Sequence, residues 1–263
     1  MDLVELGSTG LLVSPLGLGT VKFGRNQGVR YPAAFEIPDE AHLTGLLDLA
    51  RSLGINLLDT APAYGGSEER LGRLLQGQRD DWVIVSKVGE EFEDGVSRHR
   101  FTPDHFTRSL ERTLTRLRTG HVDVLLIHAD AGELAILADD ALMRTMAEFK
   151  AQGLVGAIGV STKTAAGGVR TLELMDVAMA TYTPDYTAEL PVLDYAAAHR
   201  KGVILKKVLS SGHAADVPAA IRFAFAHPGT GCAIVGTINP AHLRQLASCV
   251  TAAVGERNGV APA

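Results

Sequence analysis

Eight short apolar runs recur along the chain, and each is followed by a segment with helical spacing of apolar residues. The runs are rich in Val, Ile and Leu, without regular polar alternation, which is typical of parallel strands covered on both faces. They lie at 16–20, 56–60, 82–88, 123–129, 155–161, 177–182, 202–209 and 231–237. The helical segments lie at 39–53, 67–76, 103–118, 139–152, 164–174, 188–200, 216–227 and 240–254. This alternation predicts an α/β fold, the (β/α)8 TIM barrel.

The ends of the chain fit the same architecture. Residues 3–6 and 11–14 flank a Gly-Ser-Thr-Gly turn and predict an N-terminal β-hairpin. No linker interrupts the pattern, so a single domain over 1–263 is expected. The alternative fold is an open doubly wound sheet, which carries a Gly-rich dinucleotide loop after its first strand. Residues 16–20 lack the third glycine of that loop and run into a long loop instead of a helix.

Composition narrows the classes of partner. The chain has 263 residues and a net charge of −5 with no basic run, so no nucleic-acid partner is expected. No window approaches the roughly 18 continuous apolar residues of a membrane span, and the N-terminus lacks the pattern of a secretory signal. Cys232 and Cys249 have no metal-binding spacing, and we expect them to be reduced and structural, as in a cytoplasmic protein.

Polar side chains stand at the ends of three successive predicted strands. Asp59 ends the second strand and Tyr64 lies in the loop after it, while Lys87 ends the third strand and His128 the fourth. In a TIM barrel the carboxyl ends of the strands meet at one face, where active sites lie. We therefore expect these four side chains to converge at the mouth of the barrel.

This set of side chains matches the needs of carbonyl reduction. A hydride must come from a nicotinamide, because no protein side chain supplies one. Tyr64 would supply the proton, and the Lys87 ammonium would lower its pKa from the ordinary value of about 10. Asp59 would hold Lys87 in place, and His128 would donate a hydrogen bond to the substrate oxygen.

Each of these residues also has a purely structural interpretation. Asp59 alone is typical of a turn cap, Tyr64 of a loop anchor and His128 of a core histidine. Lys87 is harder to explain in this way, because burying an ammonium costs several kcal/mol unless it is paired. The joint placement of the four at neighbouring strand ends favours the functional interpretation.

Three motifs carry a family resemblance. The segments DTAPAYG at 59–65, SK at 86–87 and DVLLIH at 123–128 resemble the catalytic motifs of the aldo-keto reductases, in the same order. The resemblance extends from the opening hairpin to the segment before the last helix. It implies a barrel that uses NADPH or NADH without a Rossmann fold and that acts on a small aldehyde or ketone. It also implies that Tyr64 is the acid, supported by Lys87, Asp59 and His128.

The resemblance further implies a set of cofactor contacts. These are Thr20, Val21, Lys22, Asp59, Ser161, Thr162, Met179, Lys206, Lys207, Val208, Leu209, Ser210, Gly212, Gly236, Thr237, Asn239, His242 and Gln245. Thr162 and Met179 replace an Asn and a Gln that commonly hold the nicotinamide carboxamide in the family. Lys206 and Lys207 stand where many relatives have a stacking aromatic, and one of them could neutralise the pyrophosphate.

The region near the adenosine phosphate leaves the choice of cofactor open. Gly236 and His242 occupy positions where strict NADPH users tend to have Lys and Arg, so NADPH is favoured by family tendency and NADH is an alternative. Residues 22–38 form a long insertion that could wall the substrate pocket or pack as an ordinary loop. If it forms a wall, Arg25 or Arg30 would favour an anionic substrate.

Two other functions are compatible with the sequence. One is a non-catalytic nucleotide-binding regulatory protein on the same fold. The other is a lyase or aldolase in which Lys87 forms a Schiff base. The physiological substrate, the direction of the reaction and the oligomeric state are not determined by the sequence.

Overall fold

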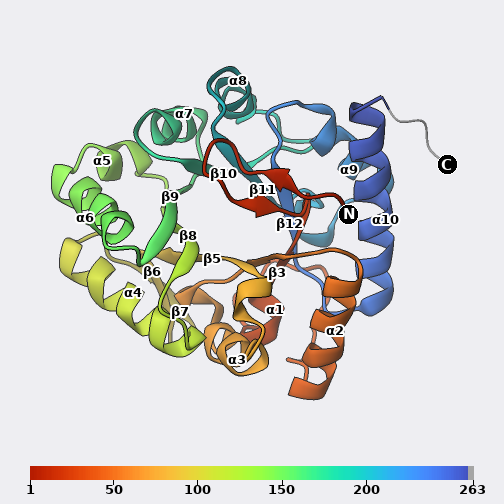
Figure 1. Cartoon of the computed structure of the whole chain (residues 1–263), viewed down its shortest axis with the longest axis horizontal. Helices are drawn as coiled ribbons and strands as arrows, with labels where there is room; N and C mark the ends of the chain where they lie inside the picture. Colours follow the sequence, from red (N-terminus) through yellow and green to blue (C-terminus); the bar gives the residue numbers. More distant parts are fainter. Residues whose placement is uncertain (260–263) are drawn as a thin grey trace.

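The computed structural model describes residues 1–259, and their main feature is a closed barrel of eight parallel strands (Figure 1). The strands are β3 (Leu16–Gly19), β4 (Leu57–Asp59), β5 (Val83–Val88), β8 (Val122–His128), β9 (Val155–Ser161), β10 (Val177–Thr181), β11 (Gly202–Lys206) and β12 (Cys232–Val235). β12 pairs in parallel with β3 and closes the barrel. This closure confirms the predicted (β/α)8 barrel and excludes the open doubly wound sheet.

The predicted helices form a ring around the barrel (Figure 1). They are α2 (Glu40–Ser52), α3 (Ser67–Leu74), α4 (Pro103–Leu117), α6 (Asp140–Ala151), α7 (Ala165–Leu174), α8 (Leu190–His199), α9 (Val217–Ala226) and α10 (Pro240–Arg257). Their starts follow the capping signals in the sequence. Thr102, for example, accepts the backbone N–H of His105 at the start of α4, with Pro103 at the first helical position.

The strand residues divide into two cores. Leu57 and Val85 belong to the cluster that fills the barrel interior, whereas Leu58 and Ile84 belong to the cluster between strands and helices. Successive residues of a strand point to opposite faces, and here both faces are apolar. This explains why the strands appear in the sequence as continuous apolar runs. Cys232 is a free thiol in the inner cluster, where burial raises its pKa.

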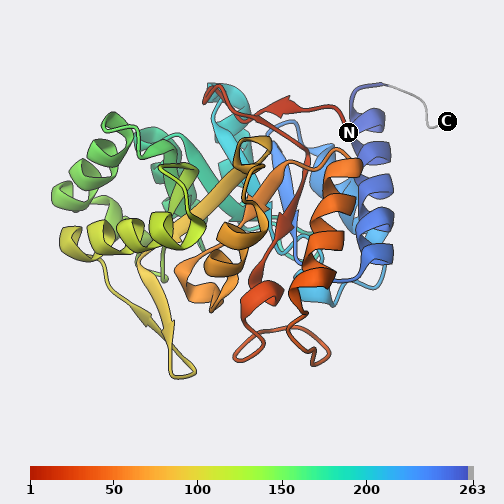
Figure 2. The ribbon, with the colours of Figure 1, turned by 60° about the horizontal axis from the view of Figure 1, so that its bottom comes forward.

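Two hairpins lie at opposite ends of the barrel. The predicted N-terminal hairpin, β1 (Val4–Glu5) and β2 (Leu12–Val13), covers the end where the strands begin (Figure 2, in red). A second hairpin, β6 (Glu90–Glu93) and β7 (Val96–His99), projects from the other end (Figure 2, in yellow). This second hairpin and the short helices α1 (Val21–Gly24) and α5 (Glu133–Leu137) are not among the elements predicted from the sequence.

The described residues form one barrel with its surrounding helices. The single domain predicted over 1–263 includes 260–263, which lie outside the described residues. No helix within residues 1–259 combines the length and the apolar character needed to cross a bilayer.

Candidate active site

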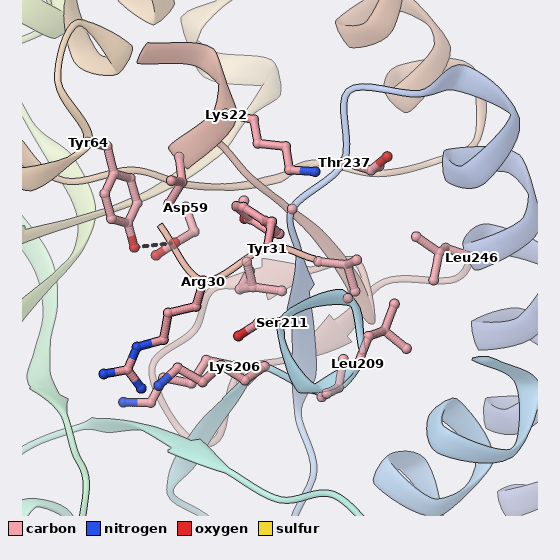
Figure 3. Close-up of a pocket in the computed structure, with 18 of the residues that line it drawn as sticks. Lys22, Arg30, Tyr31, Asp59, Tyr64, Lys206, Leu209, Ser211, Thr237 and Leu246 are labelled. Carbon is pink, nitrogen blue, oxygen red and sulfur yellow. Dashed lines mark hydrogen bonds between the residues drawn. The ribbon is translucent and has the colours of Figure 1, made fainter. Parts of the chain in front are cut away.

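A cavity of about 760 Å³ opens at the carboxyl ends of the barrel strands (Figure 3). Asp59, Tyr64, Lys87 and His128 all line it, so the four side chains converge as the sequence predicts. They come from β4, the turn after it, β5 and β8, which are neighbours in the barrel. The convergence is therefore a direct consequence of the strand order.

Lys87 and Asp59 form a buried ion pair. The Lys87 side chain is only 1% exposed, and its Nζ donates to Asp59 Oδ1 at 2.5 Å. The same nitrogen donates to the Thr60 carbonyl oxygen at 2.9 Å and to the Tyr64 hydroxyl at 3.1 Å. An ammonium has three N–H donors, so all of them are used. Lys87 is thereby held in one position below the phenol.

The turn after β4 returns Tyr64 to the barrel mouth. Residues Pro62–Tyr64 form a 3-10 turn, and Gly65 follows with a φ of 60°. A Cβ at Gly65 would lie 2.2 Å from the Gly24 carbonyl oxygen, so only glycine fits there. With this geometry the Tyr64 hydroxyl donates to Asp59 Oδ2 at 3.3 Å (Figure 3).

The pKa of Tyr64 differs from the sequence expectation. We expected Lys87 to lower it, but burial and the charge of Asp59 raise the pKa of Tyr64 well above 10. Glu90 and Tyr31 act in the same direction. The Lys87 ammonium is paired with Asp59, and its effect does not offset these contributions. The expectation of an acidified phenol is therefore wrong for this site, and Tyr64 is a neutral phenol at working pH.

Glu90 is a site residue that was not predicted from the sequence. The β6–β7 hairpin places its Oε2 2.8 Å from His128 Nδ1, in an ion-pair contact too bent for a good hydrogen bond. Burial alone would raise the pKa of Glu90, but pairing with His128, assisted by Ser97 and His99, lowers it to about 2. Burial lowers the pKa of His128, and Glu90 opposes that shift.

The Glu90 contact favours one protonation pattern of the His128 ring. An ionised carboxylate can only accept, so its proximity favours a proton on Nδ1 over a proton on Nε2 alone. A neutral ring then presents a lone pair at Nε2, and an imidazolium presents an N–H. His128 is thus an acceptor or a donor toward the cavity according to its protonation.

Most of the residues predicted to contact a cofactor line the same cavity. They are Val21, Lys22, Asp59, Ser161, Met179, Lys206, Lys207, Val208, Leu209, Gly212, Gly236, Thr237, His242 and Gln245. Ser210 lines an adjoining cavity of about 330 Å³ instead.

The three remaining predicted residues use their side chains within the fold. Thr20 donates to the Asp59 carbonyl oxygen at 2.9 Å and is fully buried. Thr162 donates to Glu189 Oε2 at 2.9 Å. Asn239 accepts the Ala241 N–H at 2.8 Å and caps α10. None of the three lines the cavity, so the predicted cofactor contacts of their side chains lack geometric support.

Lys206 and Lys207 point to different places. Lys206 Nζ donates to Ser161 Oγ at 3.0 Å and to the Thr162 carbonyl oxygen. Its ammonium is thus engaged at the group expected to bind the carboxamide. Lys207 is exposed, has a φ of 57° and also lines the adjoining cavity. Of the two lysines, Lys207 is the one free to meet a pyrophosphate.

The loop after α1 forms one wall of the cavity, as the first interpretation of residues 22–38 predicts. Arg30, Tyr31, Pro32 and Ala33 line the cavity, and Lys22 Nζ lies 4.0 Å from the centre of the Tyr31 ring (Figure 3). His213 Nε2 contacts the Arg30 carbonyl oxygen at 3.2 Å.

The two arginines of this loop have different environments. Arg25 donates to the Ala63 carbonyl oxygen at 2.9 Å, and its guanidinium lies over the Phe92 ring, 3.5 Å from the ring centre. It is held within the fold and does not line the cavity. Arg30 does, and in Figure 3 its side chain points to the same side as Lys206.

The cavity runs between the carboxyl ends of the strands and the start of α10. It extends from Tyr64 past Ser161 and Met179 to Gly236, beside the N-terminus of α10, where free N–H groups favour phosphate. Among residues 1–259, no cluster of His, Cys, Asp and Glu could hold a metal ion.

Comparison with known proteins agrees with this geometry. The family model "Aldo/keto reductase family" matches residues 15–216. The chain belongs to the aldo/keto reductase family. The predicted membership is thereby confirmed. The four predicted catalytic residues, Asp59, Tyr64, Lys87 and His128, lie inside the matched region.

Individual relatives cover different shares of the chain. A proposed aldo-keto reductase from Pseudomonas aeruginosa, solved by crystallography, is 51% identical, with a TM-score of 0.89 over 96% of this chain and 95% of its own. The uncharacterized oxidoreductase YqkF of Bacillus subtilis is 29% identical over 60% of this chain and 48% of its own. L-galactose dehydrogenase of Arabidopsis thaliana is 32% identical over 61% and 48%. The chain thus spans about half the length of these two curated relatives.

Proposed function

We propose that this protein reduces a small aldehyde or ketone to an alcohol, with NADPH as the favoured cofactor and NADH as an alternative. The observation that carries the proposal is the Tyr64–Lys87–Asp59 cluster, which faces one cavity together with His128. The family membership and the relatives named as an oxidoreductase and a dehydrogenase support it.

The role proposed for each residue in this reaction follows from the atoms that face the cavity. When bound, the nicotinamide cofactor supplies the hydride. Tyr64 Oη supplies the proton to the substrate oxygen, and Lys87 and Asp59 keep the phenol at its position. His128 orients the oxygen through Nε2, and as an imidazolium it donates a hydrogen bond there.

The raised pKa of Tyr64 is compatible with this role. The oxygen that receives the proton becomes an alkoxide, a stronger base than a phenolate, so a neutral phenol protonates it downhill. The reverse reaction requires a phenolate as base, and burial with Asp59 disfavours that form. The site is therefore better suited to reduction than to oxidation.

The other end of the cavity supports binding of the cofactor phosphates. Gly236 and Thr237 precede α10, and His242 and Gln245 face the cavity from its first turns. His242 offers an adenosine 2′-phosphate an imidazole in place of a Lys or Arg side chain. NADH is for this reason kept as an alternative.

The two competing functions receive less support. A Schiff base needs an amine with a free lone pair, whereas the Lys87 ammonium has all three N–H groups engaged. A regulatory protein without turnover has no use for the costly burial of the Lys87–Asp59 pair.

Cofactor consumption with a panel of aldehydes and ketones tests the proposal. The wild-type chain should consume NADPH or NADH with some of these carbonyl compounds. Tyr64→Phe should lose about 10²–10⁴-fold in kcat, the usual share of a proton donor, while it still binds cofactor. Tyr195→Phe, on α8 and outside the cavity, is the matched control.

The possible outcomes separate the alternatives. Cofactor binding without consumption for any carbonyl compound would favour the regulatory function. Borohydride trapping of a carbonyl compound on Lys87 would favour the lyase. Full activity of Tyr64→Phe would show that another group supplies the proton.

A further inference from the structure

Lys206 places a positive charge where an apolar strand end would be expected. It is the last residue of β11, and its Nζ donates to Ser161 Oγ at 3.0 Å and to the Thr162 carbonyl oxygen. The chain thus brings an ammonium into the cavity from β11 and fixes it on the end of β9. None of Asp59, Tyr64 and Lys87 forms a hydrogen bond with Lys206.

The position of Lys206 is close to the reacting end of the cavity. Ser161 and Met179 line the cavity on the same side, on the strands that follow β8 around the barrel. Lys206 is near enough to Lys87 and His128 for their charges to affect one another. A nicotinamide ring that reacts beside Tyr64 must therefore share this end of the cavity with the Lys206 ammonium.

The two redox states of a nicotinamide respond differently to a nearby cation. The oxidised ring carries a positive charge, and the reduced ring is neutral. Two like charges a few ångströms apart repel strongly when protein atoms surround them. We infer that Lys206 makes this cavity bind the reduced nicotinamide cofactor more tightly than the oxidised cofactor. This inference rests on the proposed function.

The charge of Lys206 depends on its neighbours. Burial lowers the pKa of Lys206 to about 7, Glu189 opposes the shift, and Lys207, Lys87 and Lys163 add to it. Glu189 comes from the start of α8, Lys87 from β5, and Lys163 from the loop after β9. His128 on β8 also faces this group. The preference for the reduced cofactor should consequently be strong at pH 6, where Lys206 is protonated, and weak at pH 9.

The test is the ratio of two dissociation constants, Kd for NADP⁺ over Kd for NADPH, measured by fluorescence and calorimetry at pH 6 and pH 9. The ratio cancels any contribution from the phosphates, which both redox states share. In the wild type it should be about tenfold higher at pH 6 than at pH 9, the size of a modest charge repulsion.

Three variants separate the charge of Lys206 from its packing. Lys206→Met should give a low ratio that no longer changes between the two pH values. Lys206→Arg should give a high ratio at both, because a guanidinium stays protonated. Lys207→Met removes a neighbouring cation that lowers the pKa of Lys206, so it should alter both constants alike and keep the ratio at pH 6 as high as in the wild type.

The outcomes keep this inference distinct from the proposed function. If both redox states bind and Lys206→Met leaves the ratio and its pH dependence unchanged, the role of Lys206 is overturned and the reductase proposal stands. If the wild type binds neither NADP(H) nor NAD(H), the proposed function fails, and this inference fails with it.

Discussion

The partners of Lys87 explain how a barrel of apolar strands tolerates a buried charge. Its Nζ has Asp59, the Thr60 carbonyl oxygen and the Tyr64 hydroxyl as partners, and its side chain is 1% exposed. A buried pair of this kind contributes little net stability, yet removing one partner leaves the other charge without compensation. The pair therefore fixes the geometry of the phenol more than it stabilises the fold.

Lys87→Met is expected to destabilise the protein by about 3–5 kcal/mol, because it leaves the Asp59 carboxylate buried and unpaired. Urea unfolding measures the loss. Lys150→Met is the control, since the Lys150–Asp176 pair at 2.6 Å is partly solvated and should be worth at most about 1 kcal/mol. A loss for Lys87→Met no greater than that of the control would contradict the buried-pair account.

Glu90→Gln tests the partner of His128. The Glu90 carboxylate raises the pKa of His128 against the effect of burial, so its removal should lower that pKa further. The imidazolium that we propose as the donor to the substrate oxygen would then be lost at a lower pH. The descending limb of kcat/KM for reduction should move to lower pH by about one unit. A pH profile of the reduction measures the shift.

The control for this shift lies on the same hairpin. Glu93 is exposed on β6 and has no contact with His128, so Glu93→Gln should leave the pH profile unchanged. An unchanged profile for Glu90→Gln as well would mean that the pair does not govern the reduction.

At the scale of elements, α3 packs closely against α4 because one residue of α3 is a glycine. Gly72 lies in α3, and a Cβ there would sit 2.0 Å from the Arg116 carbonyl oxygen. The two helices therefore touch through their backbones. Because α3 directly follows the Tyr64 turn, this contact supports the loop that carries the phenol.

Gly72→Ala should destabilise the protein by about 3 kcal/mol, because α3 must move away from α4. Gly45→Ala offers the opposite case, since Gly45 is an exposed position of α2 with nothing within 4 Å of the added Cβ. There the alanine should stabilise by about 1 kcal/mol through helix propensity. Thermal unfolding of both variants measures the difference, and equal effects would contradict the close contact.

The loop after α1 crosses the cavity and meets the opposite rim. A Cβ at Gly236 would lie 2.6 Å from Tyr31 Oη, and one at Gly212 would lie 3.2 Å from the Pro32 ring. If the proposed cofactor binds beneath this loop, movement of the loop would limit its release. Tyr31→Ala should accordingly speed cofactor dissociation about tenfold or more, as a stopped-flow chase would measure. Asn26→Ala, at an exposed position of the same loop, should not.

At the scale of the whole molecule, the strand order explains why so much could be predicted. Continuous apolar runs indicated the parallel barrel, and the barrel brings successive strand ends together, so Asp59, Lys87 and His128 converge without any knowledge of contacts. The family match and the closed barrel confirm the predicted family and fold. The roles of the individual residues stay predictions.

The missed features depend on local geometry. The β6–β7 hairpin has an Asp94-Gly95 turn with φ values of 52° and 79°, a hairpin signal that was present in the sequence. Recognising it would have pointed to Glu90. The direction of the Lys206 side chain and the raised pKa of Tyr64 depend on burial, which spacing along the chain does not reveal.

The most direct test of the account is a single turnover with reduced cofactor that carries deuterium at the transferred position. Mass spectrometry of the product locates the label. We expect one deuterium on the carbinol carbon of the alcohol, and far slower alcohol formation by Tyr64→Phe at unchanged cofactor affinity. No deuterated alcohol from any aldehyde or ketone tested, or equal rates for wild type and Tyr64→Phe, would contradict it.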